Sequence, residues 1–93
     1  MTTRTFADNP EAARYELRID GELIATAEYA EGPSSVAITR VFTRPTHRGQ
    51  GIAAEVTAFA VDEIVASGRR VVPVCSYAAK WFDDHPERRD ALA

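Results

Sequence analysis

The stretch "THRGQGIAAE", residues 46–55, decides the fold because it joins a strand-like segment to a helix-like one. Before it, "VAITRVFT" (36–43) is rich in the β-branched residues typical of a strand. After it, apolar residues recur at helical spacing over residues 52–67. The bend between these segments contains Gly49 and Gly51. Because unpaired backbone N–H groups and the positive end of the helix dipole meet where a helix begins, we expect the bend to suit an anion.

A second strand and a second helix are predicted beyond the first helix. Gly68 is a typical helix stop, and "RRVVPVC" (69–75) indicates a short buried strand. A strand, a helix and a strand in this order form a right-handed crossover, which makes the two strands parallel neighbours. The second helix is expected from about Tyr77 to Asp84, because Pro86 prevents it from extending. The predicted core face of the first helix consists of Ile52, Val56, Phe59, Ala60 and Ile64.

The segment "RYELRIDGELIATAEY" (14–29) is typical of a hairpin around an Asp-Gly turn. A two-residue loop would pair Ile19 with Glu22, and a three-residue loop would pair Arg18 with Glu22. We favour the three-residue loop, because it places most of the apolar side chains on one face. That face would consist of Tyr15, Leu17, Leu23, Ala25, Ala27 and Tyr29.

The alternation of the third strand slips by one residue. By strict alternation, Val36 and Ile38 would lie on one face of the strand and Val41 on the other. Either both faces of this strand are covered, or a bulge near Thr39 and Arg40 re-aims its side chains.

The fold class that follows is α/β, with a mixed sheet that the hairpin extends on its antiparallel side. The whole chain, 1–93, is expected to form one small domain. Residues 1–12 are expected to be a loose lead-in, residues 31–35 a turn, and the charged stretch 83–90 a solvated tail.

The composition excludes several classes of function. The formal net charge of −3 argues against non-specific nucleic-acid binding, although Arg40, Arg44 and Arg48 allow a local basic patch. No apolar run approaches the ~20 residues of a membrane span, and the amino terminus has no secretory signal. The single cysteine, Cys75, excludes an internal disulfide, so we expect a cytoplasmic protein. We predict no metal site.

Three nucleotide-binding patterns compete for the glycine bend. A P-loop requires a lysine that the bend lacks. The dinucleotide fingerprint fits Gly49 and Gly51 and tolerates Ala54, but no acidic residue ends the following strand. The third pattern, R-x-x-G-x-A, is spelled by Arg48, Gly51 and Ala53.

This third pattern carries a family resemblance. "RGQGIA" (48–53) resembles the pyrophosphate-binding signature of the GNAT superfamily of N-acetyltransferases, which bind coenzyme A. The runs "TRVFTRPTHRGQGIA" (39–53) and "VVPVCSYAAKWFDDHPE" (71–87) resemble the small single-domain GNAT-like proteins. The resemblance implies a reduced GNAT-like fold in which the two parallel strands splay apart. Pro73 agrees with such a splay, but it would equally suit an edge strand or a bulge.

The resemblance also implies a binding site for acetyl-CoA. Three residues at the end of the third strand would offer backbone groups to the pantetheine arm, and the amides of the bend would hold the pyrophosphate. The implied cofactor-binding residues are Val41, Phe42, Thr43, Arg48, Gly49, Gln50, Gly51, Ile52 and Ala53.

Cys75 and Tyr77 are the candidate catalytic residues. Cys75 ends a parallel strand just before a helix, where ligands usually bind and where a thiolate is favoured, so it is either a nucleophile or a small buried residue. Tyr77 could protonate the departing thiolate, but we favour the role of covering the core with its ring. For His47 we favour solvation over contact with phosphate, and for His85 contact with the carbonyls at a helix end. Trp81 and Phe82 are expected in the core.

The chain departs from the family in one respect. Relatives often carry a His-Thr-Glu-type run on the third strand, where this chain has Arg40, Val41 and Phe42. It also lacks the amino-terminal helices and the last strand pair that close the acceptor site in longer relatives. Both departures weaken the case for catalysis more than the case for binding coenzyme A.

The expected function is that of an acetyl-CoA-binding N-acetyltransferase acting on an unidentified amine, on a protein for example. A non-catalytic acyl-CoA-binding or protein-interaction module on the same scaffold is the alternative. A purely structural glycine bend is a weaker third reading. We expect no nucleic-acid or membrane partner, and either a monomer or a weak homodimer.

Overall fold

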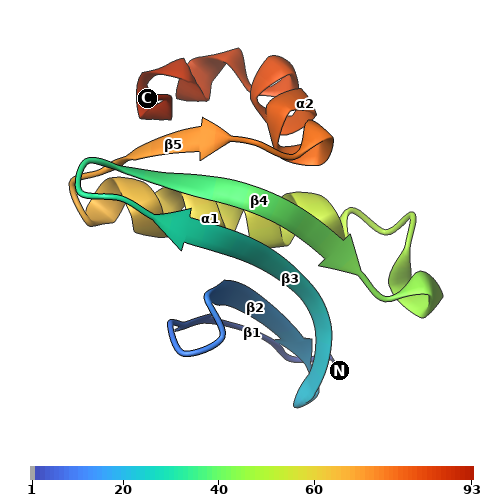
Figure 1. The fold of residues 1–93 in the computed structure, drawn as a ribbon. Helices are drawn as coiled ribbons and strands as arrows, with labels where there is room; N and C mark the ends of the chain where they lie inside the picture. Colours follow the sequence, from blue (N-terminus) through green and yellow to red (C-terminus); the bar gives the residue numbers. More distant parts are fainter. Residues whose placement is uncertain (1) are drawn as a thin grey trace.

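A five-stranded mixed sheet forms the centre of the protein, and the long helix α1 packs behind it (Figure 1). The computed structural model describes residues 2–93. Strands β1 to β4 are antiparallel, and β5 is parallel to β4, as predicted for an α/β fold with a crossover. The strands are β1 (Arg4–Asn9), β2 (Arg14–Ile19), β3 (Glu22–Glu31), β4 (Ser35–Thr43) and β5 (Arg70–Pro73). The α-helices are α1 (Ile52–Ala66) and α2 (Ser76–Asp84), and the 3-10 helices are η1 (Pro45–His47) and η2 (Pro86–Ala91).

The helices bury the faces that their periodicity predicted. Four of the five predicted core positions of α1 are buried and the fifth, Phe59, is partly buried against them. Gly68 has φ +83°, the left-handed conformation that commonly ends a helix. Trp81 and Phe82 of α2 lie in the same core, as expected. Within residues 2–93, none of the helices has the length and apolar character that a membrane span needs.

The hairpin turn corrects the predicted register. Ile19 pairs with Glu22, so the loop has two residues, and the favoured three-residue loop is wrong. Asp20 and Gly21 both have positive φ, 52° and 83°, which matches the twist of a two-residue Asp-Gly hairpin. A bulge then places one extra residue, Ile24, on β3 and restores the predicted face beyond it. That face has Tyr15, Leu17, Ala25, Ala27 and Tyr29 buried, and Leu23 is excluded from it because it pairs with Arg18.

The bulge expected in the third strand is confirmed. Tyr29 of β3 pairs with Ile38, and Glu28 pairs with Arg40, which leaves Thr39 as the extra residue of β4. The Thr39 hydroxyl donates to the Glu28 carbonyl at 3.2 Å. The extra residue shifts the alternation of side chains along β4 by one position. Side chains before and after the bulge therefore reach the sheet face covered by α1.

The expected loose lead-in is wrong, because residues 4–9 form the edge strand β1. Its pairing with β2 supplies backbone hydrogen bonds that the polar sequence did not reveal. Phe6 stacks on Phe59 with ring centroids 5.2 Å apart, and the Tyr29 hydroxyl donates to Asp8 Oδ1 at 2.6 Å. These contacts come from distant parts of the chain and have no local signal.

The charged stretch 83–90 is largely solvated, as expected, but it is helical and does not form a free tail. Residues Pro86–Ala91 form η2, which returns along β5 (Figure 1). Ala91 is buried, and the Ala93 amide donates to the Val71 carbonyl at 2.9 Å. The charged residues of this stretch face solvent while its small apolar residue joins the core, which a charge count does not reveal.

Candidate functional site

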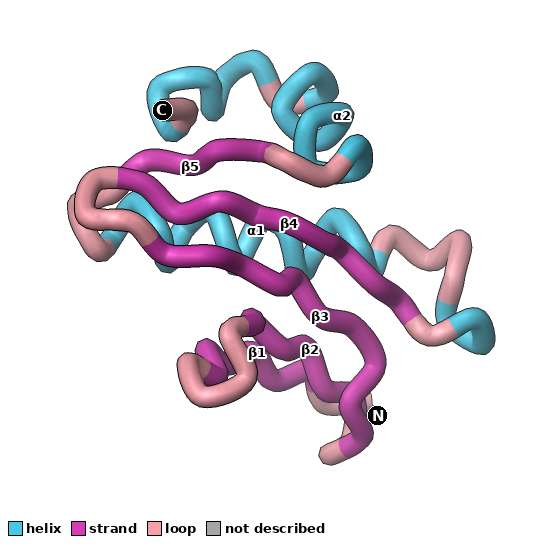
Figure 2. Tube along the Cα trace, in the orientation of Figure 1, coloured by secondary structure: helices cyan, strands magenta, loops and turns pink. Residues whose placement is uncertain are grey.

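Strands β4 and β5 pair over four residues each and then separate, as the splay hypothesis requires. The last aligned pair is Ile38 with Pro73. Beyond it the Val74 amide donates to the carbonyls of both Ile38 and Val72 at 3.1 Å, a tight turn centred on Pro73. The Cys75 amide also donates to the Ile38 carbonyl, at 3.2 Å, so the pairing with β4 stops at Ile38. Figure 2 shows β4 continuing past the end of β5. Pro73 therefore lies at the point of separation and on an edge strand, so both interpretations of this proline hold.

The end of β4 presents backbone groups to the resulting gap. The Arg44 amide donates to the Ile24 carbonyl at 2.9 Å and so faces β3. Because successive residues of a strand alternate, Phe42 faces β3 as well, whereas Val41 and Thr43 face the gap. In the described part of the chain, no strand pairs with β4 on this side beyond Ile38. Apart from the Thr43 carbonyl, which accepts from Arg48 Nε at 3.3 Å, these groups are free to pair with an extended ligand.

A cleft of about 220 Å³ adjoins this open edge. Most of its walls are residues predicted from the sequence as a binding site, with Tyr77 contributed by α2. The lining residues are Thr43, His47, Arg48, Gly49, Gly51, Ile52, Ala53 and Tyr77. Val41, Phe42, Gln50 and Cys75 do not line it.

The start of α1 forms one wall of the cleft. Gly49 and Gly51 have φ +80° and +77°, a conformation that other residues rarely adopt, and no side chain caps the helix at Gly51. The amides from Gly49 to Ala54 donate to no other described residue, and the first helical bond runs from Glu55 to the Gly51 carbonyl. Converging free amides at a helix start fit a phosphate or pyrophosphate group.

The charges around the helix start favour an anion. Arg48 lines the cleft, and its Nε donates to the Thr43 carbonyl at 3.3 Å, which ties the bend to the end of β4. Glu55, in the first turn of α1, is held by Arg4 Nε at 2.8 Å. This ion pair offsets the one carboxylate of that turn. Arg4 was not predicted as part of the site, because residues 1–12 were expected to be loose.

His47 is half-buried and lines the cleft, although solvation was favoured for it. The turn η1, which begins at Pro45, brings it there, and its Nδ1 lies 2.9 Å from the Thr46 hydroxyl. His85 lies elsewhere: its Nδ1 donates to the Trp81 carbonyl at 2.7 Å, which confirms the expected contact with a helix end.

Tyr77 is 36% exposed and faces the bend from the other wall of the cleft, so the favoured core role is wrong. Partial burial raises the pKa of its hydroxyl, Lys80 lowers it, and Asp84 adds a smaller increase. The side chain is therefore protonated at neutral pH, which suits a proton donor.

Cys75 has a structural partner. Its Sγ accepts a hydrogen bond from the Ala78 amide at 3.3 Å and so caps α2. The residue is half-buried at the point where the chain leaves β5. As a cap, the sulfur accepts a hydrogen bond from the helix. As a nucleophile, the same sulfur would have to reach the thioester carbon.

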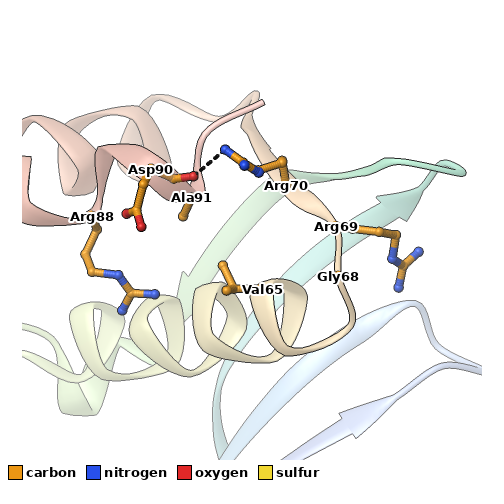
Figure 3. Close-up of a pocket in the computed structure, with 7 residues that line it drawn as sticks. All are labelled: Val65, Gly68, Arg69, Arg70, Arg88, Asp90 and Ala91. Atoms are coloured by element: carbon orange, nitrogen blue, oxygen red, sulfur yellow. Dashed lines mark hydrogen bonds between the residues drawn. The ribbon is translucent and has the colours of Figure 1, made fainter.

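A larger cleft, of about 300 Å³, lies at the opposite end of α1 (Figure 3). Three arginines line it, but each already binds another group of the protein, Arg69 through its ion pair with Glu31 at 3.7 Å. Arg88 donates to Asp62 at 2.7 Å and Arg70 to the Asp90 carbonyl at 2.6 Å, while Arg69 points away from Val65 (Figure 3). This cleft lacks the free amides found at the start of α1, so the smaller cleft is the candidate site.

Comparisons with known proteins agree with this assignment of fold. Residues 14–91 match the sequence model of the GCN5-related N-acetyl-transferase family. A search of curated proteins gave no significant match.

Three solved structures share the fold at low sequence identity. The ribosomal-protein-S18-alanine N-acetyltransferase from Escherichia coli is 14% identical, with a TM-score of 0.68 over 91% of this chain and 76% of its own. The ribosomal-protein-alanine N-acetyltransferase from Brucella melitensis biovar Abortus 2308 is 17% identical, with a TM-score of 0.62 over 77% and 61%. A predicted acetyltransferase from Clostridium acetobutylicum, solved with acetyl-CoA, is 15% identical, with a TM-score of 0.63 over 91% and 88%.

The family model spans β2 to η2 and so includes the separated strands, the glycine bend and both helices. The resemblance carried by "RGQGIA" is thereby confirmed for most of the chain. The protein belongs to the GCN5-related N-acetyltransferase family.

Proposed function

We propose that the protein binds acetyl-CoA in the cleft at the start of α1 and transfers the acetyl group to an amine. The observation that carries this proposal is the meeting of an open strand edge with free helix amides in one cleft. A ligand with an extended amide-bearing arm and a pyrophosphate matches both parts. The Clostridium acetobutylicum neighbour, solved with acetyl-CoA, supports the same ligand.

The residues of the bend would hold the pyrophosphate with their backbone amides. These are Gly49, Gln50, Gly51, Ile52 and Ala53, with Arg48 adding charge. Val41, Phe42 and Thr43 would guide the pantetheine arm along β4, with the groups that face the gap making the hydrogen bonds.

The chemistry asks little of the protein beyond orientation. The amine nitrogen bonds to the thioester carbon and releases one proton to solvent, the carbon–sulfur bond breaks, and the sulfur leaves as a thiolate. Because a thiol has a pKa near ~8.5, the thiolate is a good leaving group, and Tyr77 need only return one proton to it. Free β4 amides would stabilise charge on the carbonyl oxygen, and holding the two reactants together supplies much of the rate.

Replacement of Tyr77 with Phe should lower kcat by up to about tenfold, because only assistance to a good leaving group is lost. The effect should shrink as the pH rises above about 8.5, because the departing sulfur is then stable as a thiolate and needs no proton. A steady-state pH profile with acetyl-CoA measures this. An unchanged kcat across the pH profile would mean that Tyr77 lines the cleft but does not donate the proton.

The acceptor is proposed to be an amine on a protein, with an amino-terminal α-amine as the first class to test. Two neighbours are named as acetyltransferases of ribosomal-protein alanine. An α-amine titrates near ~8, whereas a lysine titrates near ~10.4, so more of it is neutral without a strong base. No carboxylate lines the cleft within residues 2–93 to act as such a base.

A non-catalytic acyl-CoA-binding module is the second candidate. It is favoured by Arg40, Val41 and Phe42, which stand where relatives often carry acid–base groups. Turnover of acetyl-CoA with peptides bearing a free α-amine separates the two functions. Binding without turnover on any such peptide or on lysine peptides would favour the module.

A covalent route through Cys75 is also testable. The thiolate would attack the thioester carbon, release the CoA thiol and pass the acetyl group to the amine. Mass spectrometry after incubation with acetyl-CoA should then show one acetyl group on the chain, and Cys75→Ala should abolish it. No adduct on the native chain, with turnover intact, would indicate direct transfer.

A thermal-shift titration with coenzyme A tests the binding site itself. Gly51→Ala and Gly68→Ala form a matched pair, because both glycines have φ near +80° and an added Cβ at either meets no atom within 4 Å. Both variants should lose about 1–2 kcal/mol of stability through backbone strain. Only Gly51→Ala should also lose the CoA-dependent shift, because its Cβ stands at the helix start. If the native chain shows no shift at millimolar CoA, the proposed function fails.

A further inference from the structure

Thr43 carries the one buried side-chain polar atom without a hydrogen-bond partner in residues 2–93, its Oγ1. The residue is only 8% exposed and lines the cleft at the end of β4. Thr57 shows the usual arrangement, since its buried hydroxyl donates to the Ala53 carbonyl at 2.8 Å. An unpaired buried hydroxyl costs a protein stability, and such groups are rare. The hydroxyl of Thr43 therefore needs an explanation.

Packing does not explain it. A valine at this position would fill the same space against α1 without burying an unpaired oxygen. The backbone of Thr43 is used separately, because its carbonyl accepts from Arg48 Nε. A step between staggered χ1 positions exchanges the hydroxyl with the methyl group, so the oxygen can turn toward the cleft without a backbone change.

We propose that the Thr43 hydroxyl is a side-chain hydrogen-bond partner of the pantetheine arm, an inference that rests on the proposed function. Thr43 lies between the glycine bend, which would hold the pyrophosphate, and Val41, two residues or about 7 Å further along the strand. The part of the ligand beside Thr43 is then the pantoyl end, which offers a hydroxyl and an amide. A threonine hydroxyl both donates and accepts, so it suits either group.

Thr43→Val is the direct test, because it keeps the shape and removes only the oxygen. Its melting temperature should equal or exceed that of the native chain, since an unpaired buried group is gone. Its Kd for coenzyme A should rise about three- to tenfold, the effect of one hydrogen bond. Thr43→Ser keeps the hydroxyl and should bind within about twofold of the native chain. Thr57→Val is the matched control and should leave the Kd unchanged.

Two smaller probes locate the contact. The Kd of 4′-phosphopantetheine should rise in Thr43→Val as that of coenzyme A does, whereas the Kd of ADP should not change. A loss shared by ADP would move the contact to the pyrophosphate and overturn the proposal. If Thr43→Val and the native chain bind coenzyme A with equal affinity, the Thr43 hydroxyl makes no hydrogen bond to the ligand, and the proposal is overturned. Absence of any CoA binding by the native chain would instead overturn the proposed function.

Discussion

At the residue scale, the sulfur of Cys75 has a structural role that its sequence motif does not reveal. It caps α2 by accepting from the Ala78 amide. Tyr77, two residues after the cysteine, lines the cleft. The cap thereby helps to orient the wall of the site. A residue that a sequence motif suggests as a nucleophile thus has a structural reason to be present.

Serine and alanine at position 75 separate the two roles by stability. Serine is a better helix cap than cysteine and alanine cannot cap, so Cys75→Ala should lose about 1 kcal/mol while Cys75→Ser should not. Urea denaturation measures both. If the thiol acts only as a cap, acetyl transfer should persist in the serine variant. Loss of transfer in a fully stable serine variant would contradict that role.

At the scale of elements, the bulge in β4 decides which of its backbone groups face the gap beside β5. Without the extra residue Thr39, the alternation of β4 would turn Val41 and Thr43 toward β3. With Thr39 present, the backbone N–H and C=O groups of Val41 and Thr43 face the gap left by β5. A single inserted residue thus supplies the edge on which the proposed function depends.

Amide hydrogen exchange measures this edge directly. In the free protein the amides of Val41 and Thr43 should exchange rapidly, because no strand covers them, while those of Phe42 and Arg44 are protected by β3. Saturating coenzyme A should slow the first pair about tenfold or more and leave the second pair unchanged. Equal protection of both pairs in the free protein would contradict the open edge.

At the scale of the whole molecule, the sheet face away from α1 is held by a charged network around Glu16. This carboxylate belongs to a residue only 5% exposed and accepts from Arg14, Arg18 and Asn9 at 2.7, 3.3 and 3.1 Å. The hydrogen bond from Arg14 lowers the pKa of Glu16 below its usual 4.5, against the opposing effect of burial. The network joins β1 to β2 and so anchors the edge strand.

Acid should weaken this network in a defined direction. Because the folded pKa of Glu16 is lowered, its stabilisation is full above about pH 4.5 and is lost as the pH falls below that value. Glu16→Gln should lower the free energy of unfolding at pH 7 by about 1–3 kcal/mol and reduce its dependence on acid. Glu28→Gln is the control, because its pair with Arg40 is largely exposed and contributes about 0–1 kcal/mol. Equal losses in both variants would contradict a special role for Glu16.

Much of the architecture follows from local sequence signals. The helix periodicity, Gly68, Pro86 and the strand–helix–strand order predict the crossover correctly, because each acts through the backbone of its own neighbourhood. The positive φ values of Gly49 and Gly51 likewise agree with the glycine-rich bend read from the sequence. These preferences hold wherever such residues occur, so a single chain is enough to read them.

Other features depend on contacts between residues far apart in the chain. β1 is stabilised by its pairing with β2 and by Phe59, not by its own polar sequence. The loop length at Asp20 is set together with a bulge at Ile24, which lets both strands keep their apolar side chains inward. The cleft exists because Tyr77 returns to face a bend that precedes it by a whole helix and strand.

By itself the sequence determined the kinds of elements, their order and the glycine-rich bend at the start of α1, because these arise from local backbone preference. Only the tertiary structure decided the registers, the edge strand, the walls of the cleft and the unpaired Thr43 hydroxyl. Those depend on the sum of many weak long-range contacts, and no short stretch of residues encodes that sum.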